Sequence, residues 1–332
     1  MKIKGEDHNH KGLIHYQAGD FAAALEEYNR AIDLNPNDHV AYCNRGDVHS
    51  MQGHQDVAMA DYNKSIELNA SYAEAYDGRG YIHFEAGQFR EALAEYTKAI
   101  DLNPKDHAAY NNRGAVHVEL TLWANAMADY NRAIELASDC AEAYEGRGYT
   151  YHHTGQFKEA IGDYTKAIDI NPNDCTTYYR RGLAHSRQGH WDKAIADYSK
   201  AIKLNADYAE VYYERGRLRS LRRQYSPAIA DFSKVISIYP SHAYAYFHRG
   251  CAYLRLLQRD NGISDINRAI EINPRIPEAY RARADIYYGS GQYDAAIAEF
   301  KKAIAVSDVP SYIDGVNQVI GIIERRHGQK IS

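Results

Sequence analysis

The sequence predicts an all-α fold in which a pair of antiparallel helices is repeated along the chain. Three observations support this prediction. Tyrosine recurs every 34 residues without an insertion, and glycine follows it by four residues in seven of eight cases. The apolar residues in between are spaced by three and four, which is the period of an amphipathic helix. The recurring tyrosines are Tyr42, Tyr76, Tyr110, Tyr144, Tyr178, Tyr212, Tyr246 and Tyr280.

Projected along the chain, this period predicts nine repeats and one closing helix. The first helix of each repeat should end in a left-handed conformation, which favours glycine. In five repeats the second helix should end at an Asn-Pro or Tyr-Pro step, because the residue before proline avoids the helical conformation. The closing helix is amphipathic and would cover the last repeat, with recruitment of another protein as the alternative. The predicted boundaries are 5–38, 39–72, 73–106, 107–140, 141–174, 175–208, 209–242, 243–276 and 277–308 for the repeats and 309–328 for the closing helix.

A longer period of 68 residues runs along the same stretch. Pro36, Pro104 and Pro172 end alternate repeats, whereas the repeats between them end without proline. This pattern indicates that pairs of repeats were duplicated together.

Two positions of the second helix, counted from the start of each repeat, predict the core. Position 20 is alanine in eight of the nine repeats, and position 24 is aromatic in eight. The eighth repeat departs from both, with Gly262 and Ile266. Most of the 30 tyrosines are therefore expected to be packing residues. The aromatic residues at position 24 are Tyr28, Tyr62, Tyr96, Tyr130, Tyr164, Tyr198, Phe232 and Phe300.

This combination of residues resembles the tetratricopeptide repeat (TPR) signature, and the resemblance covers nearly the whole chain. It comprises an aromatic residue at position 4, Gly at 8, Ala at 20, an aromatic residue at 24 and Pro at 32. The resemblance implies a right-handed α-solenoid, a superhelix whose first helices line a concave groove that holds peptides.

Position 7, where the family usually has leucine, is arginine in eight repeats and Lys11 in the first. A half-buried guanidinium needs a partner, because an unpaired charge between helices costs several kcal/mol. We therefore predict a ladder of ion pairs between these cations and carboxylates on the second helices, with the guanidinium groups stacked on neighbouring tyrosines. The arginines are Arg45, Arg79, Arg113, Arg147, Arg181, Arg215, Arg249 and Arg283, and the carboxylates are Glu27, Asp61, Glu95, Asp129, Asp163, Asp197, Asp231, Asp265 and Glu299.

Charge and hydropathy exclude several classes of partner. The formal net charge is -5 with no basic run, so nucleic acid is not an expected partner. No apolar segment is long enough to cross a bilayer and no signal peptide is visible, so we expect no membrane contact and a cytoplasmic location. The four cysteines form no C-x-x-C motif, which disfavours disulfides and a zinc site.

Nothing in the sequence indicates an enzyme. Nucleotide-binding, hydrolase and metalloprotease motifs are absent. Histidines at position 11 would lie in successive layers, too far apart to share a metal ion. We expect no catalytic residues, no cofactor and no metal.

The TPR resemblance places candidate binding residues at positions 2, 5, 6, 9, 12 and 13 of each repeat. Charged residues at these positions are all acidic in the first five repeats, and are nearly balanced in the last four, where arginines and aromatic residues stand together. Gly78 and Gly146 are expected to open space beside Tyr81, Phe84 and Tyr149. The candidates are Asn44, Asp47, Glu74, Asp77, Tyr81, Asn112, Glu142, Glu145, Tyr149, Tyr179, Arg180, Arg187, Tyr213, Arg217, Phe247 and Arg255.

The resulting hypothesis is a non-catalytic scaffold that binds a peptide or a segment of a partner protein. The acidic stretch would favour ligands containing Lys or Arg, and the arginine and aromatic stretch would favour apolar or carboxylate-bearing ligands. Two alternatives stay open, a merely solvated groove and a structural protein that self-assembles as a homo-oligomer.

Overall fold

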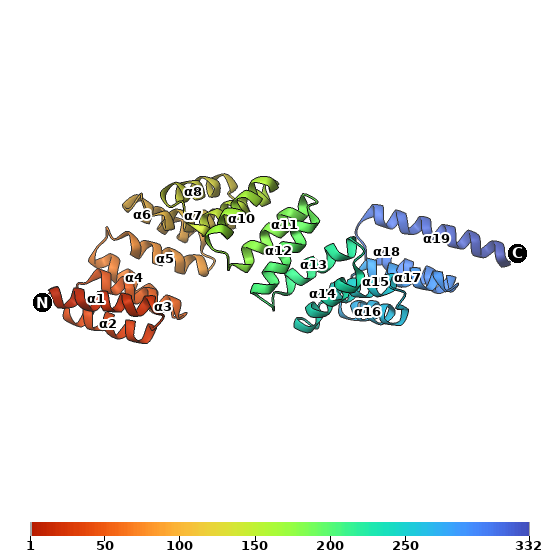
Figure 1. Cartoon of the computed structure of the whole chain (residues 1–332), viewed down its shortest axis with the longest axis horizontal. Coiled ribbons are helices and arrows are strands. Elements are labelled where there is room, and N and C mark those ends of the chain that lie inside the picture. Colours follow the sequence, from red (N-terminus) through yellow and green to blue (C-terminus); the bar gives the residue numbers. More distant parts are fainter. Residues whose placement is uncertain (1, 332) are drawn as a thin grey trace. The chain divides into compact units, whose positions relative to one another are not determined.

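The computed structural model describes residues 2–331, with side chains described for residues 7–325. Within this range every regular element is an α-helix. The chain divides after Pro172 into two compact units, called here the N-terminal unit and the C-terminal unit (Figure 1). The N-terminal unit contains α1 (Lys2–Gln17), α2 (Phe21–Leu34), α3 (His39–Met51), α4 (Gln55–Leu68), α5 (Ala73–Glu85), α6 (Phe89–Leu102), α7 (His107–Glu119), α8 (Trp123–Leu136), α9 (Ala141–His153) and α10 (Phe157–Ile170).

The C-terminal unit continues the same pattern and adds one longer helix at its end. Its helices are α11 (Cys175–Arg187), α12 (Trp191–Leu204), α13 (Ala209–Leu221), α14 (Tyr225–Ile238), α15 (Ala243–Arg255), α16 (Arg259–Ile272), α17 (Pro277–Gly289), α18 (Tyr293–Ala305) and α19 (Pro310–Ile331).

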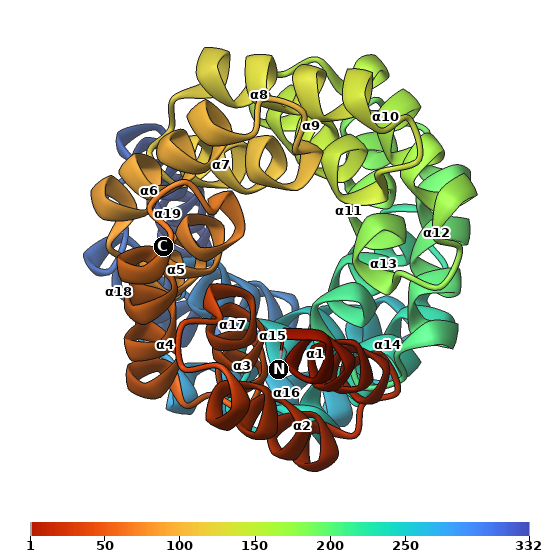
Figure 2. The ribbon, with the colours of Figure 1, turned by 90° about the vertical axis from the view of Figure 1, so that its left-hand side faces the viewer.

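Each odd-numbered helix up to α17 packs against the even-numbered helix that follows it. The odd-numbered helices from α1 to α9 also contact the next odd-numbered helix, and α13 contacts α15. Within each unit taken by itself, the odd-numbered helices of the pairs therefore form one face, called here the inner face, and the even-numbered helices lie outside them (Figure 2). The predicted all-α fold of tandem helix pairs is confirmed.

The breaks between the two helices of a pair have the predicted left-handed conformation. Six are glycines with φ between 70° and 80°, namely Gly19, Gly53, Gly87, Gly155, Gly189 and Gly291. The other three breaks place Thr121, Arg223 and Leu257 in the same region, with φ of 56°, 59° and 60°. A side chain in this conformation costs about 1–2 kcal/mol, so these three turns are held in place by the packing around them.

Helix ends reproduce the alternation seen in the sequence. After Pro36 and Pro104, the next helix begins with an aspartate cap: Asp38 accepts a hydrogen bond from the Ala41 amide at 3.1 Å and Asp106 from Ala108 at 3.0 Å. Where proline is missing, Tyr72 and Cys140 occupy the cap and make no such bond. Alternate first helices in the N-terminal unit are thus capped differently.

The predicted core residues are buried. The position-24 aromatic residues are at most 3% exposed, and the position-20 alanines are fully buried. In the eighth repeat Ile266 is fully buried, and Leu254 fills the space left by Gly262. A Cβ atom at Gly262 would stand 2.7 Å from Leu254 Cδ2, which is why this repeat tolerates no alanine there without a shift.

The arginine ladder is confirmed in eight repeats. Arg45 is typical: its Nε and Nη2 donate to Asp61 at 2.8 and 2.6 Å, and its guanidinium lies 5.3 Å from the Tyr42 ring centre. The first repeat is an exception, and the prediction there is wrong. Lys11 donates to Asp7 at 2.7 Å, while Glu27 pairs with His8 at 2.6 Å. The flexible lysine stem reaches a carboxylate one helical turn away on its own helix, so the neighbouring helix is not needed.

Most ladder arginines also reach back to the preceding helix pair. Arg45 Nη1 donates to Asn29 on α2 at 2.8 Å, and Arg215 Nη1 donates to Ser199 on α12 at 2.9 Å. Each such arginine therefore joins three helices, and the ladder holds neighbouring pairs in register.

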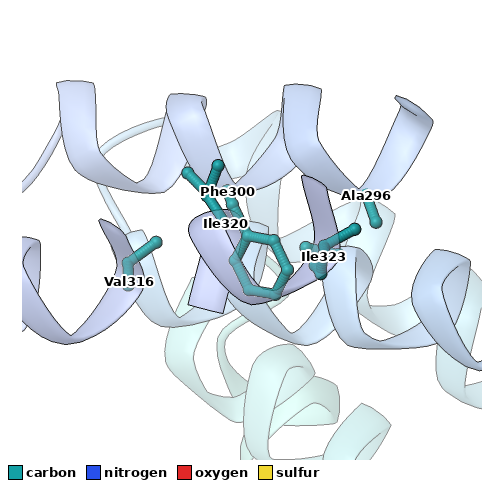
Figure 3. Packing of buried hydrophobic residues seen from close by; sticks show 6 residues of the cluster. Ala296, Phe300, Val316, Ile320 and Ile323 are labelled. Carbon is teal, nitrogen blue, oxygen red and sulfur yellow. The ribbon is translucent and has the colours of Figure 1, made fainter. Parts of the chain in front are cut away.

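The closing helix α19 covers the last pair of the C-terminal unit. Val316, Ile320 and Ile323 are buried against Phe300 and Ala296 of α18 (Figure 3). Ile313, three residues before Val316 on the same helix, is partly buried. The apolar stripe thus serves as the partner that the final pair would otherwise lack. Across the part of the chain that the structure describes, no helix has the length and apolar character needed to span a membrane.

Candidate functional site

A cavity of about 220 Å³ opens on the inner face of the N-terminal unit. Four predicted binding residues, from α3, α5 and α7, converge on it: Asp47, Asp77, Tyr81 and Asn112. The remaining lining residues are Tyr16, Ser50, Met51, Tyr62 and Gly78. The cavity thus brings together two carboxylates, an amide and three phenols. These groups are suited to a cation that donates hydrogen bonds.

Asp47 and Asp77 are partly buried carboxylates without a cationic partner. The Tyr62 hydroxyl donates to Asp47 at 2.8 Å, and the Asn112 amide donates to Asp77 at 3.2 Å. Burial raises the pKa of each carboxyl from its usual value to about 6, and these hydrogen bonds only partly oppose the rise. No lysine, arginine or histidine forms an ion pair with either group among residues 7–325.

The two glycines differ in whether they open the predicted space. A Cβ atom at Gly78 would stand 2.5 Å from the Tyr62 ring, and one at Gly146 would stand 2.4 Å from the Tyr130 ring. At Gly146 the Tyr130 ring occupies the predicted space beside Tyr149, so that part of the prediction is wrong. At Gly78 the Tyr62 ring occupies only part of it, because Gly78 and Tyr81 both line the cavity. In both places the missing side chain allows a close approach of helix and ring.

The other candidates of the N-terminal unit lie outside this cavity. Glu74 and Glu142 are exposed in the first turns of α5 and α9, and Asn44 and Glu145 are partly buried. Tyr149 packs 4.2 Å from the His153 ring, and His153 stacks in turn on Trp123. The structure thus brings together four of the nine candidates in this unit and leaves the acidic residues of α9 elsewhere.

A larger pocket of about 570 Å³ lies on the inner face of the C-terminal unit, between α13 and α15. Arg217 and Arg255, both predicted binding residues, line it together with Arg223 from the turn after α13. The other lining residues are Ser220, Leu221, Tyr225, His248, Cys251 and Ala252. No aspartate or glutamate is among the lining residues.

The charges of this pocket are only partly compensated. Arg217 pairs with Glu214 at 3.2 Å. Arg223 and Arg255 form no ion pair or side-chain hydrogen bond with the described residues. Burial lowers the pKa of His248 to about 4 and raises that of the Cys251 thiol to about 11, so both are neutral at pH 7. Ser220 Oγ is buried and has no hydrogen-bond partner.

The remaining candidates of the C-terminal unit serve mainly in packing or lie apart. Tyr179 lies 5.3 Å from the Tyr208 ring, and Tyr213 lies 6.1 Å from Phe232. Burial raises the pKa of both phenols to about 12. Phe247 packs against the cluster of Ile266 and Ile276. Arg187 is exposed at the end of α11, and Arg180 is partly buried on the same helix.

Sequence reasoning missed several lining residues for identifiable reasons. Ser50, Met51, Ser220, Leu221, His248 and Cys251 all stand at the inner positions named by the family, but the residues selected there were charged residues, aromatic residues and asparagines. Tyr62 was assigned to the core by its position 24, although its hydroxyl reaches the cavity. Arg223 occupies a turn that six other repeats fill with glycine, and this substitution was the available signal.

Histidines at position 11 pack beside ladder carboxylates. His117 Nδ1 lies 3.0 Å from Asp129, and His185 Nε2 lies 4.0 Å from Asp197. Burial lowers the pKa of both rings. Among the residues whose side chains are described, no three His, Cys, Asp or Glu side chains gather in a way that could hold a metal ion.

Paired helices with an inner face of varied polarity define a helical repeat protein of the kind that carries ligand sites on one face. Family models agree. A TPR repeat model matches residues 12–53, 80–120 and 148–189, and tetratricopeptide repeat models match 39–72, 176–208 and 247–310. The chain belongs to the tetratricopeptide repeat family.

Solved structures show the same fold. A tetratricopeptide repeat protein from Parabacteroides merdae is 20% identical, with a TM-score of 0.53 over 75% of this chain and 99% of that chain. The Cut9–Hcn1 hetero-tetramer of APC/C is 16% identical, with a TM-score of 0.56 over 89% of this chain and 59% of that one. YrrB, described as a TPR protein with an unusual peptide-binding site, is 25% identical, with a TM-score of 0.46 over 57% and 98%. No curated protein matches the sequence.

Proposed function

We propose that this protein is a non-catalytic interaction scaffold whose inner face binds a segment of a partner protein. The observation that carries the proposal is the pair Asp47 and Asp77, two partly buried carboxylates that line one cavity and lack a cation. A buried carboxylate without a cation is costly, and proteins usually pair it. A partner's lysine or arginine side chain would supply the missing charge.

The size and lining of the cavity fit one side chain. Its volume of about 220 Å³ is below the range of pockets that enclose drug-sized ligands. The amide of Asn112 and the phenols of Tyr16 and Tyr81 surround the two carboxylates and can orient an ammonium or guanidinium group. In this proposal Glu74, Glu142 and Glu145 attract the rest of a basic segment, and Tyr179, Tyr213 and Phe247 mark the corresponding face of the C-terminal unit.

Selection of peptides from a random library on the immobilised full chain tests the proposal. We expect the bound peptides to be enriched in lysine and arginine, and the enrichment to disappear in the double variant Asp47→Asn/Asp77→Asn. The matched control is Asp139→Asn/Asp169→Asn, which removes the same charge from two exposed positions outside the cavity. Circular dichroism verifies that each variant is folded. Unchanged selection by the cavity variant would refute the site.

Self-association is separated from partner binding by light scattering. We expect a constant monomer mass over a hundredfold range of concentration. A homo-oligomer that dissociates on substitution of Asp47 and Asp77 would instead assign the inner face to a second copy of the chain.

A further inference from the structure

We propose that the pocket between α13 and α15 binds a phosphorylated side chain of the partner segment, that is, a phosphomonoester on an apolar stem. The proposal rests on the proposed function in one respect only, namely that a partner protein carries the phosphate. The pocket lies wholly within the C-terminal unit and shares no residue with the acidic cavity.

The charge of the pocket matches a phosphomonoester. Arg217 is neutralised by Glu214, whereas Arg223 and Arg255 have no carboxylate partner, so the pocket carries two uncompensated positive charges. A phosphorylated side chain carries a charge of about −1.5 to −2 at pH 7. Both arginines are exposed at the mouth of the pocket, and a carboxylate would neutralise only one of them. The acceptor that balances both arginines is therefore a dianion.

The donors come from separate elements and surround a common space. Arg223 belongs to the turn after α13 and Arg255 to α15, while Ser220 on α13 offers a buried hydroxyl that lacks a partner. Guanidinium groups pair bidentately with phosphate oxygens, and a hydroxyl can donate to a third oxygen. An unpaired buried hydroxyl is costly, so a ligand acceptor that bonds to Ser220 would remove that cost.

The backbone at Arg223 supports a specific role. Its φ of 59° is the left-handed conformation that glycine adopts at the same point in six other repeats. A side chain there costs about 1–2 kcal/mol, and Thr121 and Leu257 carry the same cost in two other turns. In this turn the side chain is a guanidinium that lines the pocket, where glycine would supply no charge.

The rest of the lining accommodates the stem. Leu221, Tyr225, Cys251 and Ala252 provide an apolar and aromatic wall, and the volume of about 570 Å³ lies within the range of pockets that enclose a ligand. This space exceeds the needs of a bare phosphate ion. Phosphotyrosine, with a ring between backbone and phosphate, is the side chain that uses both the wall and the arginines.

Calorimetric titration of the full chain with N-acetyl-phosphotyrosine amide tests the proposal directly. We expect binding at least roughly tenfold tighter than that of N-acetyl-tyrosine amide, inorganic phosphate or phenylacetate, because charged hydrogen bonds and the stem act together. The double variant Arg223→Gln/Arg255→Gln should lose roughly tenfold or more for each guanidinium removed. The control Arg90→Gln/Arg275→Gln, which removes two exposed arginines outside the pocket, should bind normally.

Several results would overturn the proposal. Equal affinity for the tyrosine and phosphotyrosine amides shows that the phosphate is not read, and this comparison needs no variant. Equal affinity for phenylacetate reduces the pocket to a general anion site. Tighter binding of AMP than of the phosphotyrosine amide would show that the pocket binds a free metabolite instead of a side chain. The variant Asp47→Asn/Asp77→Asn separates this proposal from the proposed function, since it should keep its phosphotyrosine affinity even if its peptide selection is lost.

Discussion

Among other differences, the inner faces of the two units differ at the sixth position of the repeat that lines each pocket. In the N-terminal unit, Gly78 lets the ring of Tyr62 reach the cavity, where its hydroxyl donates to Asp47. In the C-terminal unit, His248 stands at the equivalent position and stacks on Phe232, with ring centres 5.6 Å apart. One face therefore presents a phenol and carboxylates, and the other a neutral imidazole beneath arginines. The comparison teaches that the residue at position six contributes to the polarity of a repeat surface through the ring it contacts, in addition to the charged residues at other inner positions.

The largest expected effect comes from removing a ladder carboxylate. Asp231 in the C-terminal unit accepts from Arg215 at 2.7 Å and from Arg219 at 2.8 Å, whereas Asp129 in the N-terminal unit serves one arginine and a histidine. Asp231→Ala leaves two guanidinium groups unpaired and should lower the free energy of unfolding by about 3–5 kcal/mol. Asp129→Ala should cost less, because His117 can remain neutral. Urea denaturation measures both, and equal losses would contradict this ranking.

The next effect is a pH dependence specific to the acidic cavity. Folding raises the pKa of Asp47 from 3.8 to about 6, so the folded state resists ionisation of this carboxyl. Ionisation of Asp47 therefore lowers the free energy of unfolding. This loss is absent below the unfolded pKa, grows as the pH rises from about 4 to about 6, and reaches at most about 3 kcal/mol. Asp47→Asn should therefore stabilise the protein at pH 7 and have little effect at pH 4.

Urea midpoints at the two pH values measure the difference between variant and parent. Asp139→Asn, at an exposed position in the same unit, is the matched control. A variant that destabilises the protein at pH 7 would show that Asp47 is paired in solution.

Two substitutions of glycine by alanine should have opposite effects on stability. One glycine faces an aromatic ring, whereas the other faces open space and responds only through helix propensity. Gly78→Ala forces the Tyr62 ring to move and should cost about 1–3 kcal/mol. Gly162→Ala in α10, where no atom lies within 4 Å of the new Cβ, should instead stabilise the protein by about 0.5–1 kcal/mol. Thermal denaturation compares them, and a stabilising Gly78→Ala would mean that the ring is mobile.

Removal of a single tyrosine hydroxyl should change the free energy of unfolding least. The change should have opposite signs in the two units. Tyr62→Phe deletes the hydrogen bond to Asp47 and should cost about 0.5–1.5 kcal/mol and raise the pKa of Asp47 further. Tyr198→Phe removes a buried hydroxyl that has no partner and should be neutral or stabilising. Urea denaturation and NMR titration of the aspartate measure these changes, and equal losses would indicate that the Tyr198 hydroxyl is bonded.

The sequence predicted the helix pairs, their breaks and the ladder because these features follow from local period and charge. Arg45 and Asp61 could be paired from sequence alone, since the period places both on facing surfaces. The cavities could not be predicted in the same way. Whether Gly78 leaves a gap depends on where the Tyr62 ring of another helix pair points, and His248 becomes a lining residue through its stacking on Phe232. Lys11 shows a further limit of prediction from sequence. A flexible lysine can reach more than one carboxylate, and the repeat spacing alone does not decide which one it pairs with.

The double attachment of the ladder arginines constrains how this chain can change in length. Arg45 lies 16 residues after Asn29 and 16 residues before Asp61, and it bonds to both. One inserted residue in a helix turns everything beyond it by about 100° and carries a partner off the shared surface. Such an insertion would break the hydrogen bond of a ladder arginine to the preceding helix or to the following one. Growth or loss by whole repeats leaves every link intact, which accounts for the uninterrupted 34-residue spacing.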